Sequence, residues 1–191
     1  MSKPANHLFT STQTVKEVNK WSPLIRLLHW GTVLLMAITW TFLLLHRQVG
    51  EPSGNFNYIA IHKAIGTLTF GWMLVHAVSY LFAKKPSYAQ LHMPNWQILV
   101  AKLVHVVLLL LLLAMPLAGI LMTMYGGRPI SMFGLFNMPV FVTPDPATAK
   151  FWYGLHTGIF WTAILTTLAI HVGAVIYHMV IKKDNVLKRM G

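Results

Sequence analysis

The sequence of 191 residues contains no cysteine. This absence excludes disulfide bonds, iron–sulfur clusters held by thiolates, and the Cys-x-x-Cys-His attachment of c-type haem. Histidine shows the opposite extreme, with ten residues. Any metal or cofactor chemistry of this chain is therefore expected to depend on imidazole ligands.

Acidic residues are nearly as scarce as cysteine. Four Asp and Glu stand against fifteen Lys and Arg, so the formal net charge is +11. A strongly basic chain can indicate nucleic-acid binding, but here the basic residues cluster at the ends of long apolar segments. With 55% hydrophobic residues and a mean hydropathy of +0.58, the composition instead indicates an integral protein of the lipid bilayer. We therefore expect no nucleic-acid partner.

Four apolar segments are long enough to cross the hydrocarbon core, for which about 20 residues suffice. Ser22-Pro23 is a typical helix start, Pro116 is expected to kink the third segment, and prolines and glycines predict a structured loop before the fourth. The predicted spans are residues 24–45, 59–82, 96–124 and 151–181. We predict an all-α integral membrane protein, in which residues 21–191 form a four-transmembrane-helix bundle and residues 1–20 a cytoplasmic N-terminal arm.

The distribution of Lys and Arg predicts the orientation, because basic residues are enriched in cytoplasmic loops. Eleven of them lie in the N-terminal region, in the loop between the second and third spans together with the start of the third span, and in the C-terminal tail. The four on the opposite side are Arg47, Lys63, Arg128 and Lys150. Both termini are therefore predicted to be cytoplasmic.

Histidines inside the predicted spans lie at two depths, and polar side chains in hydrocarbon are costly enough to suggest function. His62 and His156 follow the outer starts of their spans, whereas His29 and His171 lie in the cytoplasmic half. The fifteen residues from His156 to His171 correspond to roughly 22 Å of helix. Two facing imidazoles at one depth are the axial ligands that a haem b iron requires, so the two levels predict a two-haem path across the bilayer.

Spacing alone leaves the partner of His171 open. His76 lies at the same depth as His29, and it follows His62 by fourteen residues, so the two share one helix face. His29 and His76 are equally good candidates on this basis. A pairing of His62 and His76 with the two histidines of the fourth span would be similar to the cytochrome b of respiratory quinol oxidoreductases.

A histidine-rich metal transporter without haem is a competing interpretation. Zinc or copper transport usually needs acidic or sulfur ligands near the midplane, but the four acidic residues lie outside the predicted spans. Porphyrin fits this composition better, because it supplies four nitrogens itself and needs only two from the protein. A histidine in a membrane span can also form a hydrogen bond with a neighbouring helix and have no other role. This structural role remains an alternative for His105. His178, near the cytoplasmic end of the fourth span, is predicted to be solvated.

Five stretches of sequence resemble those of one known family. They are LLHW (residues 27–30), IHKAIG (61–66), GRPISMFGLFNMP (127–139), LH (155–156) and KKDNVLKRM (182–190). In this order and spacing, over residues 21–190, the chain closely resembles the bacterial cytochrome b561 family of four-helix, two-haem proteins. The resemblance implies a multi-pass protein of the bacterial inner (cytoplasmic) membrane.

The resemblance also implies a pairing that spacing leaves open. The cytoplasmic haem would be held by His29 and His171, and the periplasmic haem by His62 and His156. A histidine at the position of His105 looks toward the cytoplasmic haem region in this family.

Two departures from the family pattern concern the spacing of His156 and His171 and the residue at position 76. Members usually separate the two ligands of the fourth span by fourteen residues, whereas this chain has fifteen. One extra residue adds about 100° of helical turn, so either a π-bulge absorbs it or the ligand ring reaches round differently. Relatives carry arginine where this chain has His76. A neutral histidine would pair more weakly with a haem propionate than arginine does, or His76 would compete with the other histidines as a haem ligand. His76, His105 and Arg26 are candidate contacts of a propionate or quinone.

The function that the resemblance implies is electron transfer between the periplasmic face and the quinone pool. For some members it implies oxidation of superoxide outside and reduction of ubiquinone inside, which is an oxidoreductase activity. Lys63, Arg128 and Arg47 can steer an anion toward the outer haem, or can simply be solvated loop residues. The alternative is a quinol-oxidising membrane anchor that passes electrons to a periplasmic partner protein. Both use the same two haems, so the sequence does not separate them.

Overall fold

The structure is a computed structural model that describes residues 20–52, 57–87, 93–184 and 186–191. Four helical stretches in it are long and apolar enough to cross a membrane. They are α1 (Pro23–Gln48), α2 (Tyr58–Phe82), α3 (Asn95–Tyr125) and the continuous stretch Pro146–Lys182. The prediction of four membrane-spanning helices is confirmed. The predicted N-terminal arm falls, apart from its last residue, outside the described residues.

The fourth stretch is not one regular α-helix. It passes through α4 (Pro146–Gly154), the π-helical turn η2 (Leu155–Ile159), α5 (Phe160–Tyr177) and a second π-helical turn, η3 (His178–Lys182). In η2 the N–H of Phe160 donates to the carbonyl of Leu155, five residues earlier. A π-turn holds one residue more than an α-turn. The π-bulge expected as one way to absorb the fifteen-residue gap is therefore confirmed, and it includes His156.

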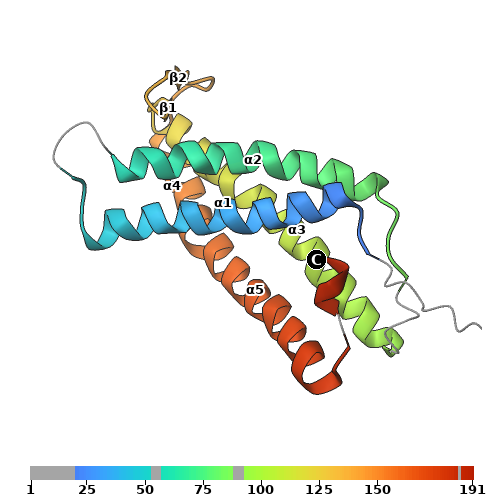
Figure 1. Ribbon diagram of the computed structural model, residues 1–191. Coiled ribbons are helices and arrows are strands. Elements are labelled where there is room, and N and C mark those ends of the chain that lie inside the picture. The colour runs from blue at the N-terminus through green and yellow to red at the C-terminus, as the bar shows by residue number, and fades with distance from the viewer. Residues whose placement is uncertain (1–19, 53–56, 88–92, 185) are drawn as a thin grey trace, which may run out of the picture.

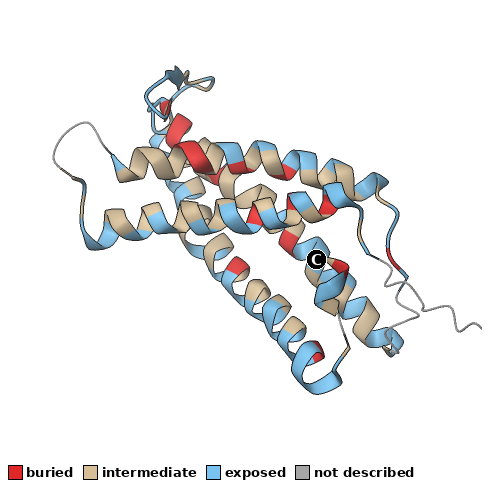
Figure 2. Ribbon diagram, in the orientation of Figure 1, coloured by how far each residue is buried: buried red, intermediate tan, exposed pale blue. Residues whose placement is uncertain are grey.

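The helices form two antiparallel pairs (Figure 1). In the first, α1 runs along α2; in the second, α3 packs against α4 and α5, and it also contacts α2. Figure 2 shows that buried residues are few and that exposed residues run along every helix. Many of the exposed residues are Leu, Val, Ile and Phe, as expected where lipid rather than water surrounds the bundle.

A β-hairpin connects α3 to α4. Strands β1 (Ile130–Met132) and β2 (Phe136–Met138) pair antiparallel. Ile130 and Met132 are buried against Ala64 of α2, with Ile120 of α3 packed on the same cluster. The sequence predicts only a structured loop here, so the hairpin is an addition to that prediction.

The fourth stretch begins at Pro146, five residues before the predicted start. Asp145 is the N-cap: its carboxylate accepts hydrogen bonds from the N–H groups of Ala147 and Thr148, each at 3.2 Å, and from the Thr148 hydroxyl. Pro146 occupies the first turn, where a missing N–H costs nothing. The hydrogen bonds from the Thr148 hydroxyl, the Thr148 N–H and the Ala147 N–H hold the pKa of Asp145 below its ordinary value.

Replacing Asp145 with alanine is expected to lower the thermal stability of the detergent-purified protein at neutral pH, because two N–H groups lose their acceptor. The pKa of Asp145 is lower in the folded protein, so its contribution is present above the unfolded-state pKa and is lost as pH falls through the folded-state pKa. The melting temperatures of the variant and the unmodified protein should therefore converge below about pH 4. Asp145→Asn, which keeps an acceptor, should be less affected at pH 7. A difference that persists undiminished in acid would contradict this role.

The C-terminal segment folds back over the start of α1. It contains the short 3-10 helix η4 (Val186–Arg189). The indole N–H of Trp30 donates to the Met190 carbonyl at 2.9 Å, and the Arg26 guanidinium donates to the Gly191 carbonyl. The buried Arg189 side chain donates to a carbonyl in the segment between α2 and α3. The tail therefore connects the start of α1 with the segment between α2 and α3.

Candidate functional site

His62 and His156 face each other from α2 and η2, with ring centroids 6.4 Å apart. The Nδ1 of His62 lies 2.9 Å from the Thr39 carbonyl, and the Nδ1 of His156 lies 2.8 Å from the Met115 carbonyl. A carbonyl only accepts hydrogen bonds, so each Nδ1 carries the proton and donates it. Each Nε2 is then left with a free lone pair, which is the form of histidine that binds a metal.

His29 of α1 and His171 of α5 form a second pair, also with ring centroids 6.4 Å apart. This pair lies toward the end of the bundle that carries the C-terminal segment. The His105 ring of α3 lies 5.2 Å from the His171 ring, and its Nδ1 is 2.5 Å from the Ala101 carbonyl. The structure thus brings His29, His171 and His105 together.

The separation within each pair can be tested against a haem iron. A histidine–metal bond is about 2 Å long, and the ring centroid lies roughly 1 Å beyond the bonded nitrogen, so two axial imidazoles have centroids roughly 6 Å apart. Both observed separations of 6.4 Å agree with this value. The residues of both pairs therefore fit bis-imidazole ligation of haem.

One side-chain nitrogen of the second pair and one of Arg26 are buried. Arg26 Nε and His29 Nδ1 are buried without a hydrogen-bond partner among the residues that the structure describes. Buried donors without acceptors are rare in native proteins. An acceptor from outside the polypeptide, such as a propionate, would satisfy the Arg26 donor, so this region also fits a bound haem.

His76 does not take part in either pair. Its Nδ1 lies 3.3 Å from the Thr32 hydroxyl, which itself donates to the Leu28 carbonyl at 2.8 Å. His76 is thus directed against α1. Of the two residues that spacing allows as partner of His171, the structure brings His29 to it.

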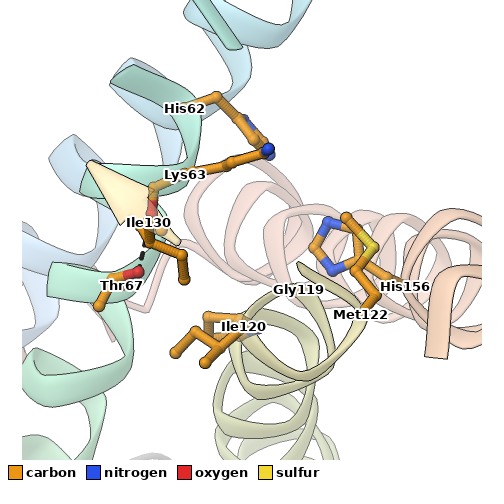
Figure 3. Close-up of a pocket in the computed structure, with 10 residues that line it drawn as sticks. His62, Lys63, Thr67, Gly119, Ile120, Met122, Ile130 and His156 are labelled. Atoms are coloured by element: carbon orange, nitrogen blue, oxygen red, sulfur yellow. Dashed lines mark hydrogen bonds between the residues drawn. The ribbon is translucent and has the colours of Figure 1, made fainter. Parts of the chain in front are cut away.

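A pocket that opens to the surface lies between His62 and His156 (Figure 3). The two rings approach it from opposite sides, and the Lys63 side chain extends beside His62. Gly119 of α3 faces His156, and a Cβ at this position would lie 2.9 Å from the ring carbon Cε1. The pocket is lined by His62, Lys63, Gly66, Thr67, Pro116, Gly119, Ile120, Met122, Ile130 and His156.

Positive charge gathers at this pocket. Lys63 lines it, and the charges of Lys63 and Arg128 are near enough to repel each other. Arg47 is exposed in the last turn of α1 and is not among the lining residues. Two of the three cations that the sequence proposes for anion steering are therefore near the pocket.

At the end of the fourth stretch the His178 ring contacts the Asp184 carboxylate. His178, predicted to be solvated, is only 8% exposed, and its Nδ1 lies 2.9 Å from Asp184 Oδ1. That prediction is wrong because Lys183 adopts a positive φ of 55° and reverses the chain, so that Asp184 returns to His178. A lysine in this conformation is uncommon, and no glycine marks the turn in the sequence.

Comparison with known proteins extends over nearly the whole chain. Residues 20–191 match the family model described as prokaryotic cytochrome b561. The chain is 32% identical to cytochrome b561 homolog 1 of Escherichia coli (strain K12) over 179 residues, which cover 91% of this chain and 97% of that protein. It is 31% identical to cytochrome b561 homolog 2 of the same organism over 130 residues, 68% of each chain. The chain therefore belongs to the prokaryotic cytochrome b561 family, and it is a multi-pass protein of the bacterial inner membrane that transfers electrons with haem b.

Proposed function

We propose that the protein holds two haem b groups, one near each side of the membrane, and transfers electrons between the periplasmic face and the quinone pool. His62 and His156 would bind the outer haem, and His29 and His171 the inner one. The observation that supports this assignment is that both pairs have the same 6.4 Å separation near opposite ends of the bundle. Bound haem supplies one-electron chemistry between its ferric and ferrous states.

The polypeptide holds the imidazoles in one protonation state and one orientation. The carbonyls of Thr39 and Met115 keep the Nδ1 protons of His62 and His156 and so direct each Nε2 toward the shared space. Such hydrogen bonds also make the ligand more basic. The rings are thereby prepared as ligands before iron arrives.

The proposed orientation places both termini in the cytoplasm. The inner pair then lies near the cytoplasmic side, where basic residues are concentrated, and the outer pair near the periplasm. Quinone would react on the inner side. His105 and Arg26 are the proposed contacts of quinone or propionate, because His105 packs against His171 and the Arg26 Nε lacks a protein acceptor among the described residues. His76 is a further candidate at this depth.

Superoxide is the proposed electron donor on the periplasmic side. Its negative charge would be attracted by Lys63 and Arg128 at the outer pocket. Two superoxide anions give up one electron each and become dioxygen, and one ubiquinone takes up the two electrons with two protons and becomes ubiquinol. The resulting activity is that of a superoxide:ubiquinone oxidoreductase.

Stopped-flow absorption tests the direction. Oxidised protein mixed with superoxide should show rapid haem reduction, and reduced protein mixed with a soluble ubiquinone should show rapid oxidation. Lys63→Gln should slow the reaction with superoxide about tenfold at low salt, whereas Lys150→Gln, an exposed change in α4 on the same side, should not. Slow reduction by superoxide beside fast reduction by ubiquinol would overturn the proposal in favour of a relay to a periplasmic protein.

Gly119→Ala is expected to lower the occupancy of the outer haem. The added methyl group would lie 2.9 Å from the Cε1 of His156 and would push the ring out of line with His62. Haem per chain, measured as the pyridine haemochrome, should fall from two toward one. Gly154→Ala is the matched control, because an added Cβ there meets nothing within 4 Å. Equal haem contents in the two variants would contradict the steric argument.

A further inference from the structure

The β1–β2 hairpin has one apolar and one polar face. Its cross-strand pairs are Ile130–Met138, Ser131–Asn137 and Met132–Phe136. Paired residues share a face and successive pairs alternate, so the first and third pairs make an apolar face and the second a polar one. Ile130 and Met132 are buried on the bundle, but Phe136, on the same face, is 62% exposed, and Leu135 beside it is 84% exposed.

The hairpin follows the end of α3 and packs against the side of α2. Figure 1 shows it beside the N-terminal part of α2, and its buried residues pack on Ala64. Ala64 is six residues inside α2, or about 9 Å along the helix. The whole of α2 is about 37 Å long, and the hydrocarbon is about 30 Å thick. If α2 is centred in the bilayer, the contact with Ala64 therefore lies a few ångströms inside the edge of the hydrocarbon.

The chemistry of this segment suits lipid better than water. No charged residue occurs between Arg128 and Asp145. Phe133 and Gly134 form the turn with positive φ values of 56° and 77°. That conformation is strained for phenylalanine, yet it carries the ring at the tip of the hairpin. Phe141, after the hairpin, is also exposed, so the apolar surface of the spans continues onto this loop.

We propose that the hairpin lies in the membrane interface as an amphipathic ribbon, in the leaflet that contains the N-terminal end of α2. Leu135 and Phe136 contact lipid acyl chains, while Ser131 and Asn137 face water. Lipid contact at the tip then holds β1 in place, and with it Ile130, which lines the pocket between the outer histidines. The partner of this surface is the bilayer itself, and the inference does not depend on the electron donor.

The absence of cysteine allows a direct test, because a single introduced cysteine can be labelled without background. Haem-containing Phe136→Cys and Asn137→Cys proteins are spin-labelled and reconstituted into vesicles of phosphatidylethanolamine and phosphatidylglycerol. Power-saturation electron paramagnetic resonance then measures collisions with oxygen and with a water-soluble nickel chelate. The ratio of oxygen to nickel collisions should exceed one at position 136 and fall below one at position 137. Leu135→Cys provides a second lipid-facing site if the first variant loses haem.

Gln48→Cys, at the exposed end of α1 on the same side, is the control and should be open to the nickel chelate. Free access of the chelate to position 136 or 135 would overturn the proposal. Shielding of all the hairpin labels from both reagents would also overturn it, because it would indicate a protein partner or a second copy of the chain. Lipid exposure at position 137 equal to that at 136 would exclude the ribbon orientation.

Discussion

Replacing His29 with alanine is expected to reduce the haem content of the purified protein from two per chain to one, whereas His76→Ala is expected to leave it at two. The His29 ring faces His171 at a centroid distance of 6.4 Å, and alanine offers no lone pair to iron. His76 instead contacts the Thr32 hydroxyl. The pyridine haemochrome, divided by protein concentration, measures the result.

Two further variants make this prediction sharper. His62→Ala should also halve the haem content, and the double variant that lacks both His29 and His62 should bind none. The low-spin absorption bands should fall in the same proportions. A full haem content in His29→Ala, or a loss of haem in His76→Ala, would show that the inner pair is assigned wrongly.

Removing one residue from η2 is expected to be tolerated, although this turn carries a proposed ligand. A π-turn holds one residue more than an α-turn, so deletion of Gly158 should restore a regular helix. His156 and His171 would then be fourteen residues apart, about 40° short of whole turns, and would remain on nearly one face. Haem content should stay at two per chain.

Adding an alanine after Gly158 should have the opposite effect. The turn already contains an extra residue, so a second one rotates His156 by about 100° relative to His171. One haem should be lost. An alanine inserted after Thr143, in the loop before α4, is the control and should keep both haems. Loss of haem on deletion of Gly158 would mean that the π-turn is needed for ligation rather than a way to absorb a residue.

The spans and the depths of the histidines were predictable, because hydrophobic length and basic flanks act through the bilayer and do not depend on tertiary detail. The choice between His29 and His76 was not predictable from spacing. Both residues lie at one depth, and only the packing of α2 against α1 turns His76 toward Thr32. The fifteen-residue gap did contain the signal for the π-turn, since an α-helix alone would change the phase of His156.

Local features without a strong sequence signal were harder to predict. The start of α4 at Pro146 was predictable from the sequence, because Asp145-Pro146 is a typical N-cap followed by proline. The hairpin was not, since its turn uses Phe133-Gly134 in place of Asn-Gly or Asp-Gly, and its strands have three residues each. The pair between His178 and Asp184 depends on a lysine with positive φ, which no propensity favours.

The C-terminal segment has a consequence for how the protein is assembled during synthesis. Its contacts with Arg26 and Trp30 join residues 160 or more positions apart, so they form only after residues 190 and 191 have left the ribosome. Contacts of such long sequence separation are slow to form. Until then Arg26 and Trp30, which flank His29 in the sequence, lack these hydrogen-bond partners. The inner site is therefore expected to admit its cofactor last, after all four helices are already in the membrane.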